Sequence, residues 1–221
     1  MKNIKGIIFD LDGTLIKSNI NFLEMKKKII DYLKSLKLDF KIKDVSSTSI
    51  SELIEYAVNK VEDEKLRRNI LKETNKLMNE EELKNLTSVS QIEGVKEALK
   101  TLKNKGFKIG VLTRGCREYA LKSLEKTCLK DLIDCLIARD DIDKPKPNPV
   151  SALKLIEEMK LTPKEVLMVG DHALDFLCAE KAGIKFIGVL TGFSSEKDFK
   201  KIGCKVIKSV NELPMLFKLK H

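Results

Sequence analysis

The sequence predicts an α/β protein: a parallel sheet with helices on both faces, interrupted by an all-helical insert. Three observations lead to this prediction. From residue 92 onward, short apolar runs alternate with amphipathic stretches, as in chains that form parallel sheets. Between about residues 17 and 88, apolar residues recur only at helical spacing. Residues 7–9 form an apolar run before this insert, so one strand of the sheet precedes it.

Each element follows from its own pattern. In the insert, apolar residues three or four positions apart predict helices around residues 22–36, 50–61 and 66–77, and a short fourth helix over 80–86. After the insert we expect, in order, a helix over 95–105, a strand over 107–112, a helix over 117–124, a strand over 132–138, a helix over 149–159, a strand over 166–169, a helix over 174–182, a strand over 186–190, a helix over 195–202, a strand over 204–207 and a last short helix.

This order of elements predicts two domains. A chain of 221 residues is long enough for one large domain with a smaller insertion. The core comprises residues 1–16 and 89–221. The insert comprises residues 17–88, and its amphipathic helices should pack as a small bundle.

Composition excludes several classes of protein. No run reaches the ~20 apolar residues that a membrane helix needs. Because the first strand begins a few residues after Met1, we expect no signal peptide and a soluble, cytoplasmic protein without membrane contact. The five cysteines are irregularly spaced and form no C-x-x-C pair, which argues against disulfides and zinc. His172 and His221 are the only histidines, so histidine-based catalysis is not expected.

The formal net charge of +9 is compatible with nucleic acid or with small anions as partners. The lysines are scattered and often lie near acidic residues, as on solvated helix faces. There is no arginine-rich run and no aromatic RNA-binding motif. We therefore expect a small anionic partner and no nucleic acid.

Two carboxylates end the first strand. Asp10 and Asp12 are separated by one residue, so alternation along a strand places them on one side. Like charges buried together are costly unless a positive group lies between them, and a divalent cation meets that need. Asp-x-Asp-Gly is also ordinary turn chemistry. A calcium loop would require further oxygen ligands, which the residues after Gly13 do not supply. The motif alone leaves a turn and an active site both open.

Other polar residues follow other strands. In open parallel sheets, ligands bind beyond the carboxyl ends of the strands, where these residues meet. The residues expected at this edge are Asp10, Asp12, Thr113, Arg114 and Asp171, with Lys144 in a neighbouring loop. Their convergence favours an active site.

Four segments resemble the motifs of the haloacid dehalogenase superfamily: Asp10-Leu11-Asp12-Gly13-Thr14, Leu112-Thr113-Arg114-Gly115, Lys144-Pro145-Lys146-Pro147 and Gly170-Asp171-His172-Ala173-Leu174-Asp175. The insert lies between the first two, as in phosphoglycolate phosphatase-like members with a helical (C1-type) cap. The resemblance implies a Rossmann-like core, a cap that determines substrate specificity, and a mobile flap over residues 15–21.

The resemblance also implies catalytic roles. Asp10 is the expected nucleophile, forming an aspartyl-phosphate, and Asp12 the general acid and base. Mg²⁺ is the expected cofactor, held by Asp10, Asp171 and the Asp12 backbone carbonyl. Because the dehalogenases lack an acid at the position of Asp12, this residue favours phosphoryl transfer.

Further groups are expected to bind the phosphate. Thr113 should donate its hydroxyl and Arg114 its backbone N–H. The Arg114 side chain points either into the site or outward. Lys144 should supply the positive charge that offsets the nucleophile and the transferring phosphoryl group, with Lys146 as the rival because both flank Pro145.

For three residues of the fourth motif, the sequence leaves more than one role open. Asp171 is either a metal ligand or a helix N-cap. Asp175, one helical turn further, either reaches the metal through water or holds Lys144. His172 stands where the family usually has a small residue. It either reaches the substrate, tunes the metal site or packs at the helix start.

Together these observations predict a magnesium-dependent phosphatase acting on a small phosphorylated metabolite. The alternatives are a sugar phosphomutase of the same superfamily and a non-catalytic regulatory module. In the cap, polar residues either read the leaving group or form turns. These residues are Asn19, Asn21, Lys43, Ser46, Ser47 and Thr48.

Overall fold

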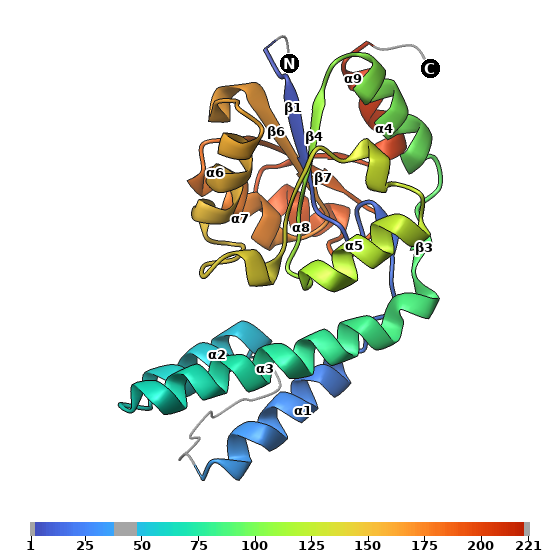
Figure 1. Cartoon of the computed structure of the whole chain (residues 1–221). Helices are drawn as coiled ribbons and strands as arrows, with labels where there is room; N and C mark the ends of the chain where they lie inside the picture. The colour runs from blue at the N-terminus through green and yellow to red at the C-terminus, as the bar shows by residue number, and fades with distance from the viewer. Residues whose placement is uncertain (1–2, 38–47, 219–221) are drawn as a thin grey trace. The chain divides into compact units, whose positions relative to one another are not determined.

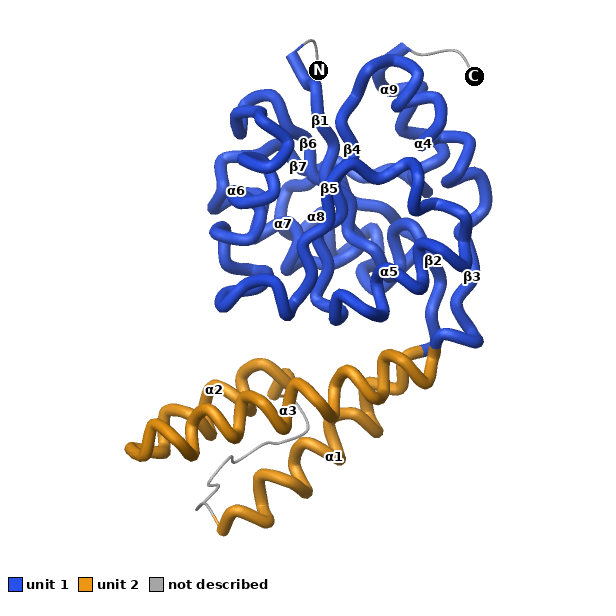
Figure 2. The backbone as a smooth tube through the Cα atoms, viewed as in Figure 1, with its two compact units in different colours: residues 1–19, 86–221 blue, residues 20–85 orange. Residues whose placement is uncertain are grey.

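The computed structural model describes residues 3–37 and 48–218. The chain forms two compact units, one of Met1–Asn19 with Leu86–His221 and one of Ile20–Asn85 (Figure 2). The expected insert spans residues 17–88. The second unit therefore begins three residues later than expected and ends three residues earlier. Lys43, Ser46 and Ser47 lie outside the described residues.

The first unit contains a six-stranded parallel sheet, as the sequence predicts (Figure 1). In spatial order the strands are β5 (Cys135–Ile137), β4 (Lys108–Leu112), β1 (Gly6–Phe9), β6 (Val166–Gly170), β7 (Lys185–Val189) and β8 (Lys205–Ile207). The first strand in the chain is thus central. Its four residues are all buried, because helices cover both faces of the sheet.

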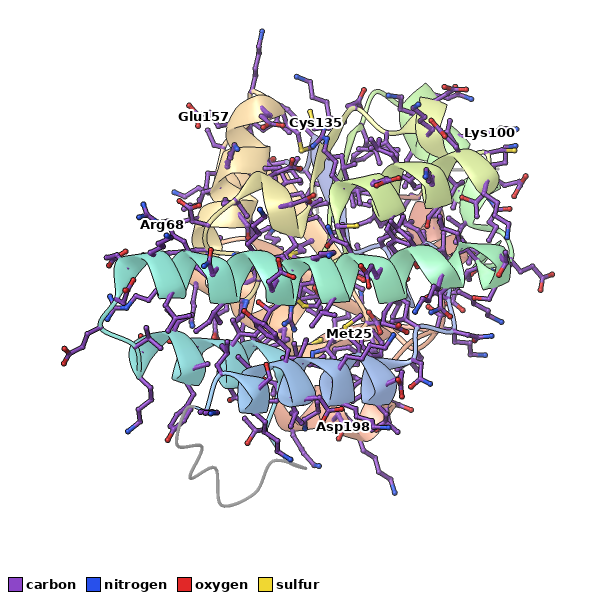
Figure 3. All side chains as sticks on the ribbon, turned by 60° about the horizontal axis from the view of Figure 1, so that its bottom comes forward. Met25, Arg68, Lys100, Cys135, Glu157 and Asp198 are labelled. Atoms are coloured by element: carbon purple, nitrogen blue, oxygen red, sulfur yellow. The ribbon has the colours of Figure 1, made fainter. Side chains whose placement is uncertain are left out.

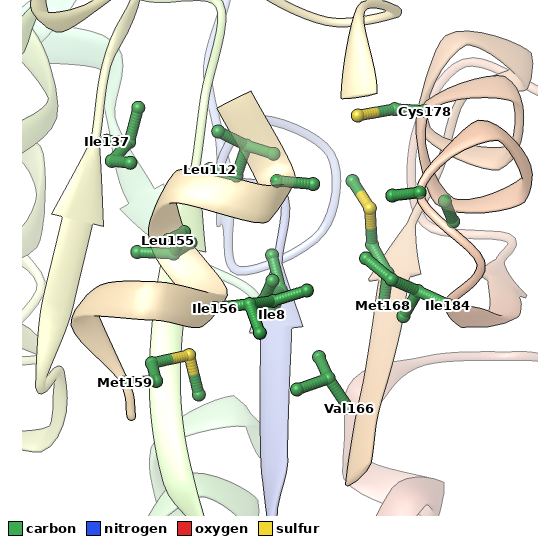
Figure 4. Packing of buried hydrophobic residues seen from close by; sticks show 13 residues of the cluster. Ile8, Leu112, Ile137, Leu155, Ile156, Met159, Val166, Met168, Cys178 and Ile184 are labelled. Atoms are coloured by element: carbon green, nitrogen blue, oxygen red, sulfur yellow. The ribbon is translucent and has the colours of Figure 1, made fainter. Parts of the chain in front are cut away.

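Helices α6 (Pro149–Glu158) and α7 (Ala173–Lys181) cover one face, and α4 (Val95–Asn104) lies on the other (Figure 1). Figure 4 shows Ile156 and Met159 at α6 packed with Ile8 of β1 and Val166 of β6. Successive strand residues point to opposite faces of the sheet. Ile7 and Phe9 of β1 are therefore directed toward the face that α4 covers. The prediction of helices on both faces is confirmed.

The remaining elements of this unit are short or peripheral. They are β2 (Ile16–Lys17), β3 (Ser90–Gln91), α5 (Arg117–Lys126), α8 (Glu196–Lys201), α9 (Leu213–Leu216) and the 3₁₀ turns η1 (Asn85–Ser88), η2 (Lys130–Leu132), η3 (Arg139–Asp141), η4 (Pro163–Glu165) and η5 (Val210–Glu212). Strands β2 and β3 pair antiparallel in a separate two-stranded sheet. Strand β2 thus occupies part of the segment expected to form a flap.

The second unit consists of α1 (Phe22–Ser35), α2 (Ile50–Asn59) and α3 (Glu64–Lys84). Asn21, Ser49 and Asp63 cap these helices by accepting backbone N–H groups. Their apolar faces form one core, in which Met25 lies between α1 and α3 (Figure 3). The other buried members are Ile29, Leu33, Ile54, Ala57, Val61, Ile70 and Met78.

For two elements, the predicted bounds differ from those in the structure. The short helix over 80–86 is the end of α3, which runs without a break from Glu64 to Lys84. No glycine or proline interrupts that stretch, and Glu81 is held inside it by Lys28 and Lys84. The strand expected over 132–138 is only Cys135–Ile137, because Leu132 ends a 3₁₀ turn.

Among residues 3–37 and 48–218, no helix combines the length and the apolar character needed to cross a bilayer.

Candidate active site

The candidate site lies where the three central strands end. In the sheet register, Phe9 of β1 pairs with Val111 of β4 and with Val169 of β6. Asp10 therefore follows β1 at nearly the level where Thr113 follows β4 and Asp171 follows β6. The sheet itself brings these three residues to one edge, because parallel strands end on the same side.

Three carboxylates meet at this edge. Asp10, Asp171 and Asp175 are buried, and each offers an oxygen within 4.8 Å of the others. Asp175 comes from the first turn of α7, directly after the loop that carries Asp171. Such a cluster is unstable without nearby positive charge.

Lys146, and not Lys144, supplies that charge. The Lys146 Nζ contacts Asp10 Oδ1 and lies 2.7 Å from Asp175 Oδ1, and the residue is only 3% exposed. Lys144 is exposed. The expectation that Lys144 offsets the nucleophile is therefore corrected in favour of its rival. The two residues lie on either side of Pro145, in a turn closed by the Asn148 N–H donating to Pro145 O, and only the second lysine is buried.

The charges in this cluster shift one another's ionisation. Burial raises the pKa of Asp10 well above its usual range, against the opposing effect of Lys146, and Asp175 and Asp171 raise it further. Burial also raises the pKa of Asp171. Burial alone would lower the pKa of Lys146, but Asp10 and Asp175 raise it above its usual range. The ammonium group therefore stays charged between two carboxylates.

The donor set fits a hard divalent cation. Three carboxylates face one ammonium group, so negative charge remains in excess, and every ligand atom is an oxygen. Mg²⁺ prefers carboxylate oxygens. Both oxygens of Asp175 accept close hydrogen bonds, from Lys146 Nζ at 2.7 Å and from His172 N–H at 3.1 Å. Asp171 Oδ1 has only a long contact from the Thr14 hydroxyl, at 3.5 Å, so Asp10 and Asp171 are the better candidates as ligands.

The structure distinguishes the alternatives at the fourth motif. His172, and not Asp171, is the N-cap of α7: its Nδ1 accepts the Leu174 N–H at 3.0 Å. Asp175 holds a lysine, but that lysine is Lys146. The His172 ring lies against Phe193, with 4.7 Å between ring centroids, and burial lowers the pKa of His172. His172 therefore packs at the helix start.

The loop after β7 fixes Asp171 in place. The Phe193 N–H donates to Asp171 Oδ2 at 2.6 Å, and the Ser194 N–H donates to the Asp171 backbone oxygen at 3.0 Å. The Thr191 hydroxyl donates to the Gly13 carbonyl oxygen at 2.6 Å, which ties this loop to the first motif. A Cβ at Gly192 would lie 1.9 Å from Asp171 Oδ2, so only glycine fits.

We therefore expect Gly192→Ala to raise the Mg²⁺ concentration needed for half-maximal activity by about tenfold, because the added methyl group displaces the Asp171 carboxylate. The measurement is a Mg²⁺ titration of phosphatase activity. Gly183→Ala is the control. The backbone at Gly183 has a φ of 70°, which is strained for alanine, but the added Cβ would meet no atom from another part of the chain within 4 Å. This variant should therefore lower stability and leave the Mg²⁺ requirement unchanged. Equal Mg²⁺ curves for wild type and Gly192→Ala would contradict this prediction.

Asp12 is held by two hydroxyl groups. The Ser18 hydroxyl donates to Asp12 Oδ1 at 2.5 Å, and the Tyr119 hydroxyl donates to the same oxygen at 2.6 Å. Burial and then the Asp12 carboxylate raise the pKa of Tyr119 above its usual range, so its hydroxyl remains a proton donor. Asp12 thus has a different environment from the Asp10 cluster, with hydroxyl groups in place of an ammonium.

The proposed phosphate-binding residues lie at the end of β4. Thr113 is buried, and its hydroxyl oxygen accepts the Gly115 N–H at 3.0 Å. The hydroxyl proton is therefore directed elsewhere, as a phosphate donor requires. Arg114 is half-buried, and its backbone oxygen accepts a hydrogen bond from Arg139.

Sequence reasoning missed Tyr119, Ser18 and Gly192. Gly192 had a usable signal, since it follows β7, another strand that ends at the same edge of the sheet. Tyr119 had none, because an apolar position on an amphipathic helix normally indicates core packing.

Several known proteins are similar to this chain in sequence. The model of the haloacid dehalogenase-like hydrolases matches residues 7–189. A pyrophosphatase PpaX from Anoxybacillus flavithermus is 32% identical over 187 residues, which cover 85% of this chain and 84% of that protein.

Solved structures share the fold. One from Bacteroides fragilis, described as haloacid dehalogenase-like, has a TM-score of 0.71 at 21% identity and covers 95% of this chain and 99% of its own. Another, described as a predicted phosphoglycolate phosphatase from Haemophilus somnus, has a TM-score of 0.66 at 22% identity and covers 98% and 99%. The family match includes all four motif segments and most of the chain, and this protein belongs to the haloacid dehalogenase-like hydrolases.

Proposed function

We propose that this protein is a magnesium-dependent phosphatase that hydrolyses a small phosphorylated substrate through an aspartyl-phosphate on Asp10. The observation that carries the proposal is the contact of Lys146 with Asp10 inside a cluster of three buried carboxylates. A buried carboxylate next to a fixed ammonium is suited to attack an anionic phosphoryl group, since the ammonium offsets the repulsion.

In the first step, an Asp10 carboxylate oxygen attacks phosphorus, and the bond from phosphorus to the leaving oxygen breaks. Asp12 donates its proton to that oxygen. Thr113 and the backbone N–H of Arg114 donate to the phosphoryl oxygens. In the second step, Asp12 takes a proton from water, the water oxygen attacks phosphorus, and the bond to Asp10 breaks to release phosphate.

Asp10, Asp171 and the Asp12 backbone carbonyl would hold Mg²⁺. When bound, Mg²⁺ neutralises charge on the carboxylates and on the phosphoryl oxygens. Lys146 and Asp175 would remain a fixed pair beside it, so Lys146 keeps its orientation through both steps.

We assign catalysis to residues 1–16 and 89–221 and leaving-group recognition to a cap of residues 17–88. Asn19, Asn21 and Thr48 are the described cap candidates. Small phosphate monoesters are the first substrate class. Inorganic pyrophosphate is the second, because the PpaX relative is aligned along most of both chains. The same two steps apply to it, with phosphate as the leaving group.

A phosphate-release screen tests this function. Purified protein with Mg²⁺ is incubated with pyrophosphate, phosphoglycolate, sugar phosphates and p-nitrophenyl phosphate, and inorganic phosphate is measured. We expect release from at least one of these substrates. Isomerisation of a sugar phosphate without phosphate release would favour the phosphomutase alternative, and inactivity on the whole panel would argue against a phosphatase.

Removing the metal should remove most of this activity. With excess EDTA, we expect the rate on p-nitrophenyl phosphate to fall by about tenfold or more, since carboxylate repulsion then opposes the substrate anion. Adding Mg²⁺ in excess of EDTA should restore the rate. Full turnover in EDTA would contradict the role assigned to Mg²⁺.

A further inference from the structure

We infer that Tyr119 and Ser18 are positioning residues that orient Asp12 and keep its transferable proton on Oδ2. This inference rests on the proposed function, because it concerns the group that protonates the leaving oxygen. Neither residue belongs to the four motif segments.

Two hydroxyl groups converge on one oxygen of the Asp12 carboxylate. Both hydroxyl groups donate to the same oxygen, Asp12 Oδ1, at 2.5 Å from Ser18 and 2.6 Å from Tyr119. Distances of this length are typical of strong hydrogen bonds from a hydroxyl to a charged oxygen.

The two donors come from different elements. Tyr119 lies in the first turn of α5 and is fully buried, so packing fixes its ring. Ser18 directly follows β2, whose pairing with β3 fixes the backbone there, and the next residue donates its N–H to Ser88 Oγ. Two donors from independently held elements restrict rotation of the Asp12 carboxylate more than one donor could.

The consequence concerns the position of a proton. An oxygen that accepts two hydroxyl hydrogens has both lone pairs engaged, so Oδ1 is a poor place for a further proton. The acid form of Asp12 therefore carries its proton on Oδ2, and the base form accepts the water proton there. Without the two donors, the carboxyl group could rotate and the proton could lie on either oxygen.

The leaving group provides the test. A phenolate leaves phosphorus with little help when its conjugate phenol is acidic, and needs more protonation when it is not. We propose measuring kcat/KM for Tyr119→Phe on p-nitrophenyl phosphate and phenyl phosphate, since kcat/KM reports the step in which the leaving group departs. We expect the loss on phenyl phosphate to exceed the loss on p-nitrophenyl phosphate by about tenfold.

Ser18 gives an independent variant in case Tyr119→Phe folds poorly. Ser18→Ala should shift the ratio of the two kcat/KM values in the same direction, and Ser18→Thr, which keeps a hydroxyl, should largely restore it. Thr101→Val is the matched control: it removes a hydroxyl that donates to the Glu97 backbone oxygen within α4, and the ratio should stay at the wild-type value.

Equal fractional losses on both substrates for Tyr119→Phe and Ser18→Ala would overturn the inference and leave both residues as packing groups. This outcome differs from failure of the proposed function. That failure would appear as activity in Asp10→Asn, which does not depend on how Asp12 is held. Asp12→Asn sets the expected upper limit of the leaving-group effect.

Discussion

Asp10→Asn should lower phosphatase activity by about 10⁴-fold or more, because the amide cannot form the acyl phosphate that the proposed mechanism requires. The substitution preserves shape, and the amide oxygen can still accept a hydrogen bond from Lys146. The measurement is the rate of phosphate release from p-nitrophenyl phosphate at saturating Mg²⁺.

Thermal unfolding shows whether that loss comes from chemistry or from the fold. In EDTA, Asp10→Asn should melt at or above the wild-type temperature, since one of three clustered carboxylates becomes neutral. With Mg²⁺, wild type should gain more stability than the variant, which lacks a ligand. Asp10→Asn protein that is folded and still active would mean that another residue is the nucleophile.

The position of the site could be predicted from the sequence because it depends on the sheet. Asp10 and Asp171 directly follow apolar strands, and parallel pairing in register brings such residues to one edge whatever the loops do. The same logic, applied to β7, would have included Gly192. Patterns of period 2 and 3.6 therefore predict the strands, the helices and the shared edge.

Residues in loops could not be predicted in the same way. Lys144 and Lys146 have the same chemistry and the same distance from Pro145, and no periodicity tells which side chain turns inward. The choice depends on the local turn and on the pull of Asp10 and Asp175, which are distant in sequence. The role of Tyr119 could not be predicted for the same reason, because its partner Asp12 lies 107 positions away in the sequence.

The end of α3 illustrates a third limit. The polar stretch around Glu81 weakens the apolar pattern and suggests a break, but the carboxylate accepts hydrogen bonds from Lys28 and Lys84. Contacts with another helix thus stabilise a continuous α3 that its local pattern does not predict.

Lys146→Met should lower activity by about 10²- to 10³-fold, because it removes the positive charge beside the nucleophile while keeping an unbranched side chain of similar length. It should also destabilise the metal-free protein by about 3–5 kcal/mol, since Asp10 and Asp175 lose their buried partner. Added Mg²⁺ should recover part of this stability and little of the activity.

Lys144→Met is the matched control, with the same substitution two residues away on an exposed side chain. We expect its activity to stay within about twofold of wild type and its stability to change by less than about 0.5 kcal/mol. The assay is kcat/KM on p-nitrophenyl phosphate, with urea unfolding in EDTA and in Mg²⁺. If Lys144→Met is the inactive variant and Lys146→Met the active one, the Lys146–Asp10–Asp175 contacts are only structural. In that case the lysine of the catalytic step is the one that the resemblance first implied.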